Sequence, residues 1–183
     1  MSARSPESAR SPDAPLVSIA VESPLWGEGD LQGLAEQAVD AALAEAGVAT
    51  APGAERAILF CDDDAIRALN RDWRRIDKPT NVLSFPAHDD PGRLARSPTL
   101  GDIAVAQETC AREAAEEGKR FDDHVRHLIV HGVLHLLGYD HNDDEEAEAM
   151  EATERRALAR IGVGDPYAGA QLAADDATAE AAR

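Results

Sequence analysis

Short apolar runs alternate along the chain with longer stretches that carry apolar residues at helical spacing. The short runs, which are rich in β-branched residues, predict strands at 15–21, 57–61, 82–85 and 103–106. The longer stretches predict helices at 31–47, 62–74, 107–119, 121–137 and 143–162. Strands interspersed with helices indicate a layered domain of the α+β or α/β class. Between the last two strands, residues 88–102 form a Pro/Gly-containing loop, and loops of this length are often functional or mobile.

The stretch from Val125 to Leu137 is apolar around nearly all of its helical circumference, so this helix is predicted to be buried and central. Four histidines share one stripe of it, within an arc of roughly 80° at 100° per residue. They are His124, His127, His131 and His135. One reading is that they are polar core residues satisfied by hydrogen bonds. The other is that some of them bind a metal ion.

The spacing of three histidines favours a metal site. His131 and His135 are one helical turn apart, so both rings reach a single ion at roughly 2.0–2.1 Å, and His127 and His131 share that spacing. Gly138 decides for the first pair, because a glycine in the left-handed conformation ends the helix and returns His141 toward the ion. Three nitrogens leave the fourth tetrahedral position open, which is the pattern of a catalytic rather than a structural zinc.

The same spacing occurs in metzincin proteases, whose general base is a glutamate directly after the first histidine. Here Gly132 occupies that position, so peptide hydrolysis by that route is not expected. Asp140 is a candidate base and equally a candidate acceptor for the N–H group of a ligand. His124 and His127 are expected to be hydrogen-bond partners, caps or surface residues rather than ligands.

Composition and charge narrow the class of protein. The chain has 183 residues, 44% of them hydrophobic, which suffices for one domain with an aliphatic core. The formal net charge of −17 argues against nonspecific binding to nucleic acid or anionic lipid but permits a local basic site. Residues 67–78 hold five basic residues against two acidic ones, a local charge of +3. Residues 140–183 hold twelve acidic residues against four basic ones, a local charge of −8.

Cys61 and Cys110 are far apart and lack CxxC spacing, so reduced thiols are predicted rather than a disulfide or a zinc ribbon. No secretory signal and no apolar stretch of membrane-spanning length is visible, which indicates a cytoplasmic protein. The Ser/Pro/Arg-rich residues 1–14 and the Ala/Asp/Gly-rich residues 164–183 are predicted to be disordered tails. They flank a single domain at 15–163.

Three separated motifs in the same order resemble the YbeY family of bacterial rRNA maturation factors. They are LNRDWRRIDKPTNVLSFP at 69–86, LGDIAVA at 100–106 and HGVLHLLGYDH at 131–141. The resemblance spans about residues 15–160 and is far more specific than a metal motif alone. It implies a single α+β domain with a four-stranded, mostly parallel mixed sheet, about five helices and a central buried metal-binding helix.

The resemblance also implies an activity. It suggests a zinc-dependent endoribonuclease that cleaves single-stranded RNA, matures the 3′ end of 16S rRNA and takes part in late-stage 70S ribosome quality control. Carried over by motif position, His131, His135 and His141 bind one Zn²⁺ ion, and Arg74 is the catalytic basic residue. The implied partners are precursor rRNA and the ribosome or its small subunit, with no DNA and no membrane.

Two other functions stay open at this point. One is a ribosome-assembly factor whose zinc is mainly structural and whose nuclease activity is weak. The other is a hydrolase of a different substrate, such as a peptide. Phosphate contacts are predicted for a basic group at the end of the second helix: Arg71, Arg74, Arg75 and Lys78. Trp73 either stacks a base or lies in the core, and we expect it in the core.

Overall fold

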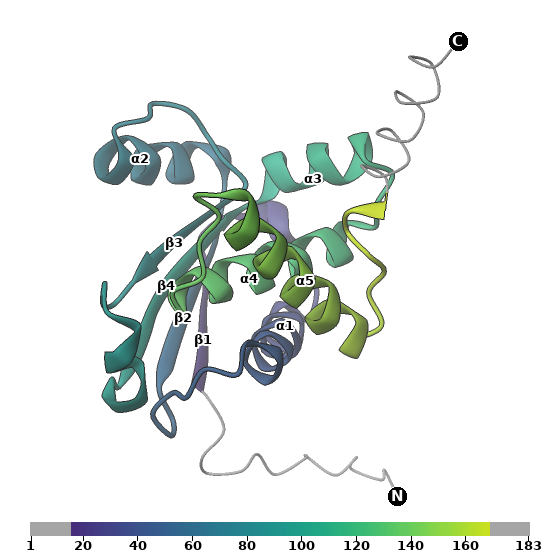
Figure 1. The fold of residues 1–183 in the computed structure, drawn as a ribbon. Coiled ribbons are helices and arrows are strands. Elements are labelled where there is room, and N and C mark those ends of the chain that lie inside the picture. Colours follow the sequence, from purple (N-terminus) through teal and green to yellow (C-terminus); the bar gives the residue numbers. More distant parts are fainter. Residues whose placement is uncertain (1–15, 169–183) are drawn as a thin grey trace, which may run out of the picture.

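One four-stranded sheet organises the protein (Figure 1). The computed structural model describes residues 16–168, and residues 1–15 and 169–183 lie outside the described part. The strands are β1 Leu16–Val21, β2 Glu55–Cys61, β3 Val82–Pro86 and β4 Thr99–Ala106, in the order β1-β2-β4-β3. Strands β1, β2 and β4 are parallel, and β3 runs antiparallel to β4 at one edge. This confirms the predicted α+β domain with a mostly parallel sheet.

The five predicted helices are all present in the described part of the chain. They are α1 Leu31–Ala46, α2 Asp63–Arg74, α3 Gln107–Glu116, α4 Phe121–Leu136 and α5 Asp144–Arg160. Their ends follow local signals: Gly47 closes α1 in the left-handed conformation, and the Asp62 side chain accepts the N–H of Ala65 at the start of α2. None of the helices between residues 16 and 168 is long and apolar enough to cross a membrane.

The predicted loop between the last two strands is shorter than expected. Strand β4 begins at Thr99 rather than at residue 103, and residues Pro91–Arg96 form a short 3-10 helix with Leu94 buried. Gly101 interrupts the sequence pattern typical of a strand, and its φ is +126°. It pairs with Arg56 of β2, at the point where the register between β2 and β4 shifts. A glycine adopts this conformation at little cost, so a strand continues where the sequence pattern suggests a turn.

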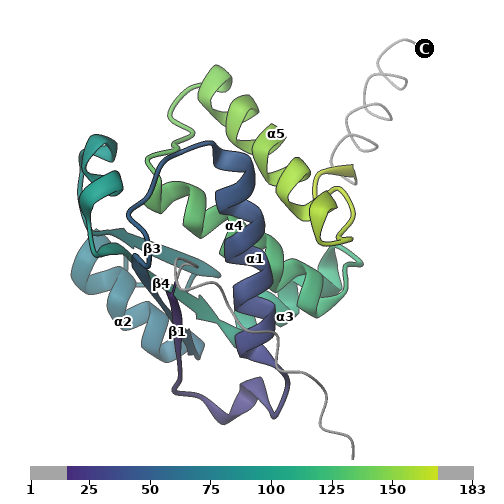
Figure 2. The same ribbon diagram turned by 90° about the horizontal axis from the view of Figure 1, so that it is seen from below.

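The helices cover both faces of the sheet (Figure 2). Ile58 and Ile103 point to the face that α1 and α4 cover, whereas the neighbouring Cys61 and Ala104 point to the α2 side, together with Ile66 of that helix. This alternation is the period of two expected of a strand. Helix α5 lies over α1 and α4 on the outside. Cys61 and Cys110 are buried free thiols, as predicted.

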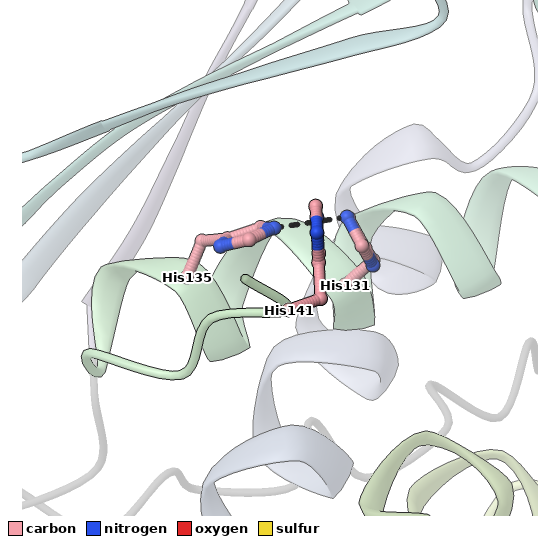
Figure 3. A group of neighbouring side chains, drawn as sticks. All are labelled: His131, His135 and His141. Carbon is pink, nitrogen blue, oxygen red and sulfur yellow. Dashed lines mark hydrogen bonds between the residues drawn. The ribbon is translucent and has the colours of Figure 1, made fainter. Parts of the chain in front are cut away.

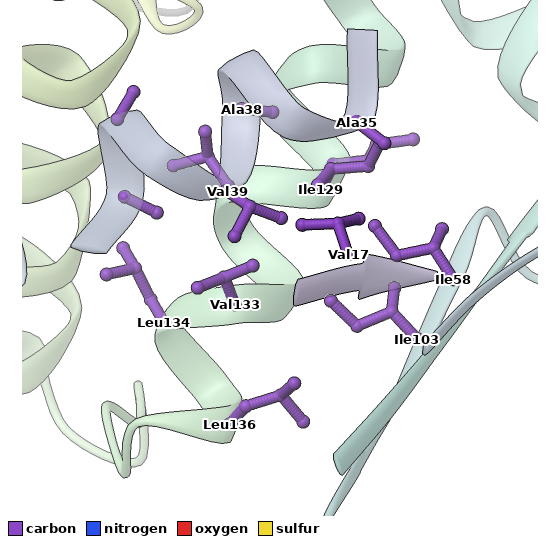
Figure 4. Packing of buried hydrophobic residues seen from close by; sticks show 14 of the residues in the cluster. Val17, Ala35, Ala38, Val39, Ile58, Ile103, Ile129, Val133, Leu134 and Leu136 are labelled. Carbon is purple, nitrogen blue, oxygen red and sulfur yellow. The ribbon is translucent and has the colours of Figure 1, made fainter. Parts of the chain in front are cut away.

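Helix α4 is the central element of the larger core. Its side chains meet the sheet on one side and α1 on the other (Figure 4). The cluster includes Ile129 and Val133 of α4, Val17, Ile58 and Ile103 of the sheet, and Ala35 and Ala38 of α1. Each large aliphatic side chain buried here contributes about 1.5–3 kcal/mol relative to exposure. The helix that carries the histidines is therefore fixed by the protein's main hydrophobic contacts.

Gly132 is the point at which α4 lies against strands β3 and β4. A Cβ atom at this position would be 3.1 Å from both the Ser84 hydroxyl oxygen and the Ile103 Cδ1 atom. The Ser84 hydroxyl donates a hydrogen bond to the Gly132 carbonyl at 3.3 Å. Position 132 thus faces the packed sheet, and a side chain there would have to displace Ser84 and Ile103.

We expect Gly132→Glu to lower the free energy of unfolding by on the order of 3 kcal/mol, because the side chain both overpacks the contact and buries a carboxylate. Urea denaturation measures this loss. A matched control is Ala115→Glu, at an exposed position of α3, which is expected to stay within about 0.5 kcal/mol of the wild type. A Gly132→Glu protein as stable as this control would contradict the packing argument.

Candidate metal centre

Three histidine side chains converge at the end of α4 (Figure 3). His131 and His135 come from the last two turns of the helix, and His141 comes from the loop that follows it. The nitrogen atoms that these residues offer as ligands all lie within 4.8 Å of one another. The Nε2 atoms of His131 and His135 are 3.0 Å apart. The structure therefore brings together the three residues that the sequence predicts as ligands.

The turn after α4 delivers His141 to this group. Gly138 has a φ of +90°, its N–H donates to the His135 carbonyl, and the Tyr139 N–H donates to the Leu134 carbonyl, both at 3.0 Å. A Cβ atom on Gly138 would lie 2.5 Å from Cγ of Pro91, so a side chain is excluded by space as well as by conformation. The predicted left-handed, helix-ending role of this glycine is confirmed.

The loop is further held by Asp140. Its carboxylate accepts the backbone N–H of His141 at 2.8 Å and a hydrogen bond from the Asn142 side chain. These bonds, led by the one from His141, lower the pKa of Asp140 below its usual value. The carboxylate contacts the backbone of a predicted ligand rather than its ring, and its lowered pKa makes it a weaker base.

A buried carboxylate on α5 fixes His131. Glu154 is fully buried, and its Oε1 atom accepts a hydrogen bond from Nδ1 of His131 at 2.7 Å. Its Oε2 atom lies 3.1 Å from Nε2 of His127 and also accepts the Tyr167 hydroxyl. Burial alone would raise the pKa of Glu154, but the hydrogen bonds from His127 and His131 outweigh it and lower the pKa to about 2. The carboxylate is therefore ionised near neutral pH.

The hydrogen bonds at Nδ1 determine where the two rings on α4 carry their protons. Nδ1 of His131 faces the Glu154 carboxylate, and Nδ1 of His135 lies 3.0 Å from the Tyr139 carbonyl. Carboxylates and carbonyls only accept, so both neutral rings hold their proton on Nδ1. Their Nε2 lone pairs then face each other, and a cation between them relieves the repulsion.

A metal ion fits this arrangement better than an extra proton does. Burial lowers the pKa of His135, with a further contribution from the nearby His131 and His141, so this ring resists protonation. Two nitrogens bound tetrahedrally at 2.0–2.1 Å are roughly 3.3 Å apart, close to the observed separation of the Nε2 atoms. Three neutral imidazoles are a common donor set for zinc, so the residues present fit the ion.

The two remaining histidines of the stripe lie outside the triad. Nε2 of His124 pairs with a Glu113 carboxylate oxygen at 2.9 Å, and His127 pairs with Glu154. Both serve as hydrogen-bond partners, in line with the expectation from the sequence. The Glu154 carboxylate thus contacts both His127 and the predicted ligand His131.

Glu154 and Tyr167 are the site residues that the sequence reading missed. Helix α5 is rich in acidic residues, yet Glu154 lies on the stripe that also buries Met150, Ala157 and Leu158. The position of this carboxylate among apolar residues at helical spacing is the sequence signal that indicates a buried, paired glutamate. Tyr167 falls in the predicted tail at 164–183, but its ring lies against His127 with centroids 5.5 Å apart. The packed part of the chain therefore reaches at least Tyr167, and residues 169–183 lie outside the described part.

A cleft of about 970 Å³ opens beside the triad. The three histidines line it together with Arg74, at the end of α2, and Phe85, on the edge strand β3. Arg74 is exposed and makes no ion pair with the described residues, whereas Arg71 pairs with Asp72 at 3.0 Å. The structure thus places the predicted catalytic arginine in the same cleft as the predicted metal ligands.

Trp73 also lines this cleft, and the expectation that it lies in the core is wrong. Its side chain is 71% exposed. Trp73 follows Ile66 and Asn70 on the buried stripe of α2, but at this end of the helix it meets the outermost strand. Its ring contacts Phe85, with centroids 5.5 Å apart, and no further strand lies beyond β3 in the described sheet to cover it.

Comparisons with known proteins agree with these features. A family model described as Endoribonuclease YbeY matches residues 22–162. A Methylocella silvestris protein named Endoribonuclease YbeY is 53% identical over 154 residues, covering 84% of this chain and 86% of the relative. A Rhizobium meliloti protein of the same name is 51% identical over 158 residues, covering 82% of this chain and 94% of the relative. The solution structure of a Thermotoga maritima protein superposes with a TM-score of 0.50 at 25% identity, covering 80% of this chain and 91% of that one.

The matched region contains the whole cleft wall and the three histidines, and it spans most of the described residues. The matched region also contains the three sequence motifs at 69–86, 100–106 and 131–141 that resemble this family. The similarity extends over more than four-fifths of the chain in both relatives. The chain belongs to the endoribonuclease YbeY family.

Proposed function

We propose that the protein is a zinc-dependent endoribonuclease specific for single-stranded RNA, which matures the 3′ end of 16S rRNA and takes part in 70S ribosome quality control in the cytoplasm. The observation that carries the proposal is the convergence of three imidazoles, with the Nε2 atoms of His131 and His135 3.0 Å apart, in a cleft that the exposed Arg74 also lines. The names of the relatives support RNA as the substrate. Its partners are precursor rRNA and the small ribosomal subunit.

The three histidines, Arg74 and the buried Glu154 have distinct tasks in this proposal. His131, His135 and His141 hold the zinc ion, which supplies Lewis acidity toward a phosphate oxygen or toward water. Arg74 donates two hydrogen bonds to the phosphate and stabilises the negative charge that develops on it. Glu154 keeps the His131 ring oriented, with Nε2 toward the ion.

The absence of a carboxylate at position 132 bears on the choice of nucleophile. Two attacking groups are compatible with the cleft: a water molecule, and the 2′-hydroxyl of the RNA itself. Attack by the 2′-hydroxyl forms a P–O2′ bond and breaks the P–O5′ bond; the 2′-hydroxyl loses one proton, the leaving 5′-oxygen gains one to become a hydroxyl, and no activated water is needed. The product ends distinguish them, because internal attack leaves a 2′,3′-cyclic phosphate and water leaves a 5′-phosphate with a free 3′-hydroxyl.

A second function is favoured by the link between the histidines and α5. Because His131 is bound to Glu154 of another helix, an ion at the triad would also tie together α4, the following loop and α5. Such an ion suits a ribosome-assembly factor with a mainly structural zinc and weak nuclease activity. His135→Ala separates the two functions: an enzyme keeps its melting temperature and loses cleavage, whereas a structural zinc protein unfolds.

Cleavage of a precursor small-subunit rRNA by purified variants tests the proposed enzyme. We expect His131→Ala and Arg74→Glu each to lower the cleavage rate by about 100-fold or more, because one removes a ligand and the other the phosphate contact. Arg120→Glu makes the same charge reversal at an exposed residue preceding α4, at the end far from the triad, and is expected to cleave normally. Metal analysis of the wild type identifies the ion, since imidazoles also bind nickel and copper. Undiminished cleavage by both His131→Ala and Arg74→Glu would contradict the assignment of these residues to the active site.

Glu154→Gln tests the orientation of His131 through metal affinity. The amide loses the charge and offers one acceptor oxygen in place of two, so we expect the zinc dissociation constant to rise about 10- to 100-fold. Competition with a chromogenic chelator measures it on metal-free protein. Glu151→Gln, one turn earlier on α5 at a residue that pairs with Arg155, is the matched control. Tyr167→Phe leaves both histidine contacts of Glu154 in place and is expected to have a smaller effect than Glu154→Gln. Equal affinities for Glu154→Gln and the wild type would refute the role.

A further inference from the structure

The exposed Trp73 and the half-buried Phe85 form an aromatic pair that lines the cleft. Among the large hydrophobic residues of the described part, Trp73 is the most exposed, at 71%. Ile76, three positions further along the chain, is 40% exposed. The Trp73 and Phe85 rings are 5.5 Å apart and inclined by 60°. Phe85 is held in β3, where it pairs with Asp102 of β4. The indole thus rests on a fixed ring while most of its surface stays accessible.

Basic residues follow Trp73 closely along the chain, and one of them, Arg74, lines the same cleft. Arg74, Arg75 and Lys78 are exposed, and none of them forms an ion pair within residues 16–168. Arg75 closes α2 in the left-handed conformation with a φ of +63°, and it is the one residue other than glycine with a positive φ in that range. Glycine would adopt this conformation without strain, so the guanidinium is placed here at a conformational cost.

This combination of groups matches the chemistry of a nucleotide. An open indole face stacks on a base, and adjacent guanidinium and ammonium groups pair with the phosphates on either side. The whole chain has the opposite sign, with a formal net charge of −17, so the basic group is a local exception. A base inside a duplex is already stacked and paired, so its π-face is not free to meet the indole. The surface therefore selects an unpaired strand.

We propose that Trp73, supported by Phe85, stacks a base of single-stranded RNA in the cleft, while Arg74 contacts the adjoining phosphate. The inference rests on the proposed function, in that it identifies the feature of the substrate that the cleft recognises. It adds a binding subsite outside the metal centre and gives a physical reason for preferring single strands. Equal binding of an RNA duplex would instead indicate a duplex on this surface, and no binding of RNA would indicate a protein segment.

The protein's two tryptophans allow a direct test by fluorescence. Trp26 is only 6% exposed, and its indole N–H donates to the Cys61 carbonyl, so a response to added RNA reports on Trp73. A short single-stranded RNA is titrated into full-length His131→Ala protein, which retains the subsite but is expected not to cleave. We expect saturable quenching by the single strand and little by a duplex of the same sequence. In Trp73→Phe protein we expect no fluorescence response, although binding persists.

Affinity measurements complete the test. Trp73→Ala is expected to weaken single-strand binding roughly 5- to 100-fold, as loss of one stacked base does, and to raise KM more than it lowers kcat. Trp73→Phe retains a ring and is expected to restore most of the affinity. Leu25→Ala, at another exposed apolar residue, is the matched control and is expected to leave binding unchanged. Trp73 and Leu25 are exposed, so these substitutions are expected to leave the melting temperature unchanged. Measuring the melting temperatures verifies that the variants are folded.

The outcomes separate this inference from the proposed function. Normal cleavage and binding by Trp73→Ala would overturn the stacking subsite and leave the nuclease standing. Trp73-dependent quenching by a single strand, with no cleavage by the zinc-loaded wild type, would keep the subsite and overturn the nuclease. Equal quenching by single strand and duplex, or no binding of RNA at all, would also overturn the subsite.

Discussion

The hydrogen bond between the buried Glu154 carboxylate and Nδ1 of His131 is the interaction on which the site depends. It sets the proton on one side of the ring and thereby turns the Nε2 lone pair toward His135. A carbonyl does the same for His135. The fold makes this possible by holding α4 between the sheet and α1, so that α5 can bring its carboxylate to the ring from outside. The hydrophobic core and the polar site are therefore two faces of the same helix.

Features that depend on local geometry could be predicted from the sequence. The convergence of the three histidines follows from a one-turn spacing and a helix-ending glycine, and the helix ends follow from caps such as Asp62 and Gly47. Features that depend on distant contacts could not. Glu154 meets His131 across 23 positions of the chain, and the exposure of Trp73 depends on where the sheet ends. The start of β4 was missed because Gly101 interrupts the strand pattern.

The absence of a glutamate at position 132 has a steric reason as well as a chemical one. In this fold the position after the first histidine lies against Ser84 and Ile103 of the sheet, and a side chain there would have to displace these neighbours. The histidine spacing shared with metzincin proteases thus defines how an ion is held, and the packing of the helix decides which neighbours can assist the chemistry. Similar metal motifs on differently packed helices need not share a reaction.

The order of residues along the chain has a consequence for synthesis. All three histidines precede Glu154, and Tyr167, whose hydroxyl the carboxylate accepts, comes later still. During translation the histidines therefore emerge from the ribosome before the groups that fix the tautomer of His131. The fully organised centre arises only once nearly the whole packed chain has been made. A nascent chain without α5 accordingly lacks the carboxylate that orients the His131 ring.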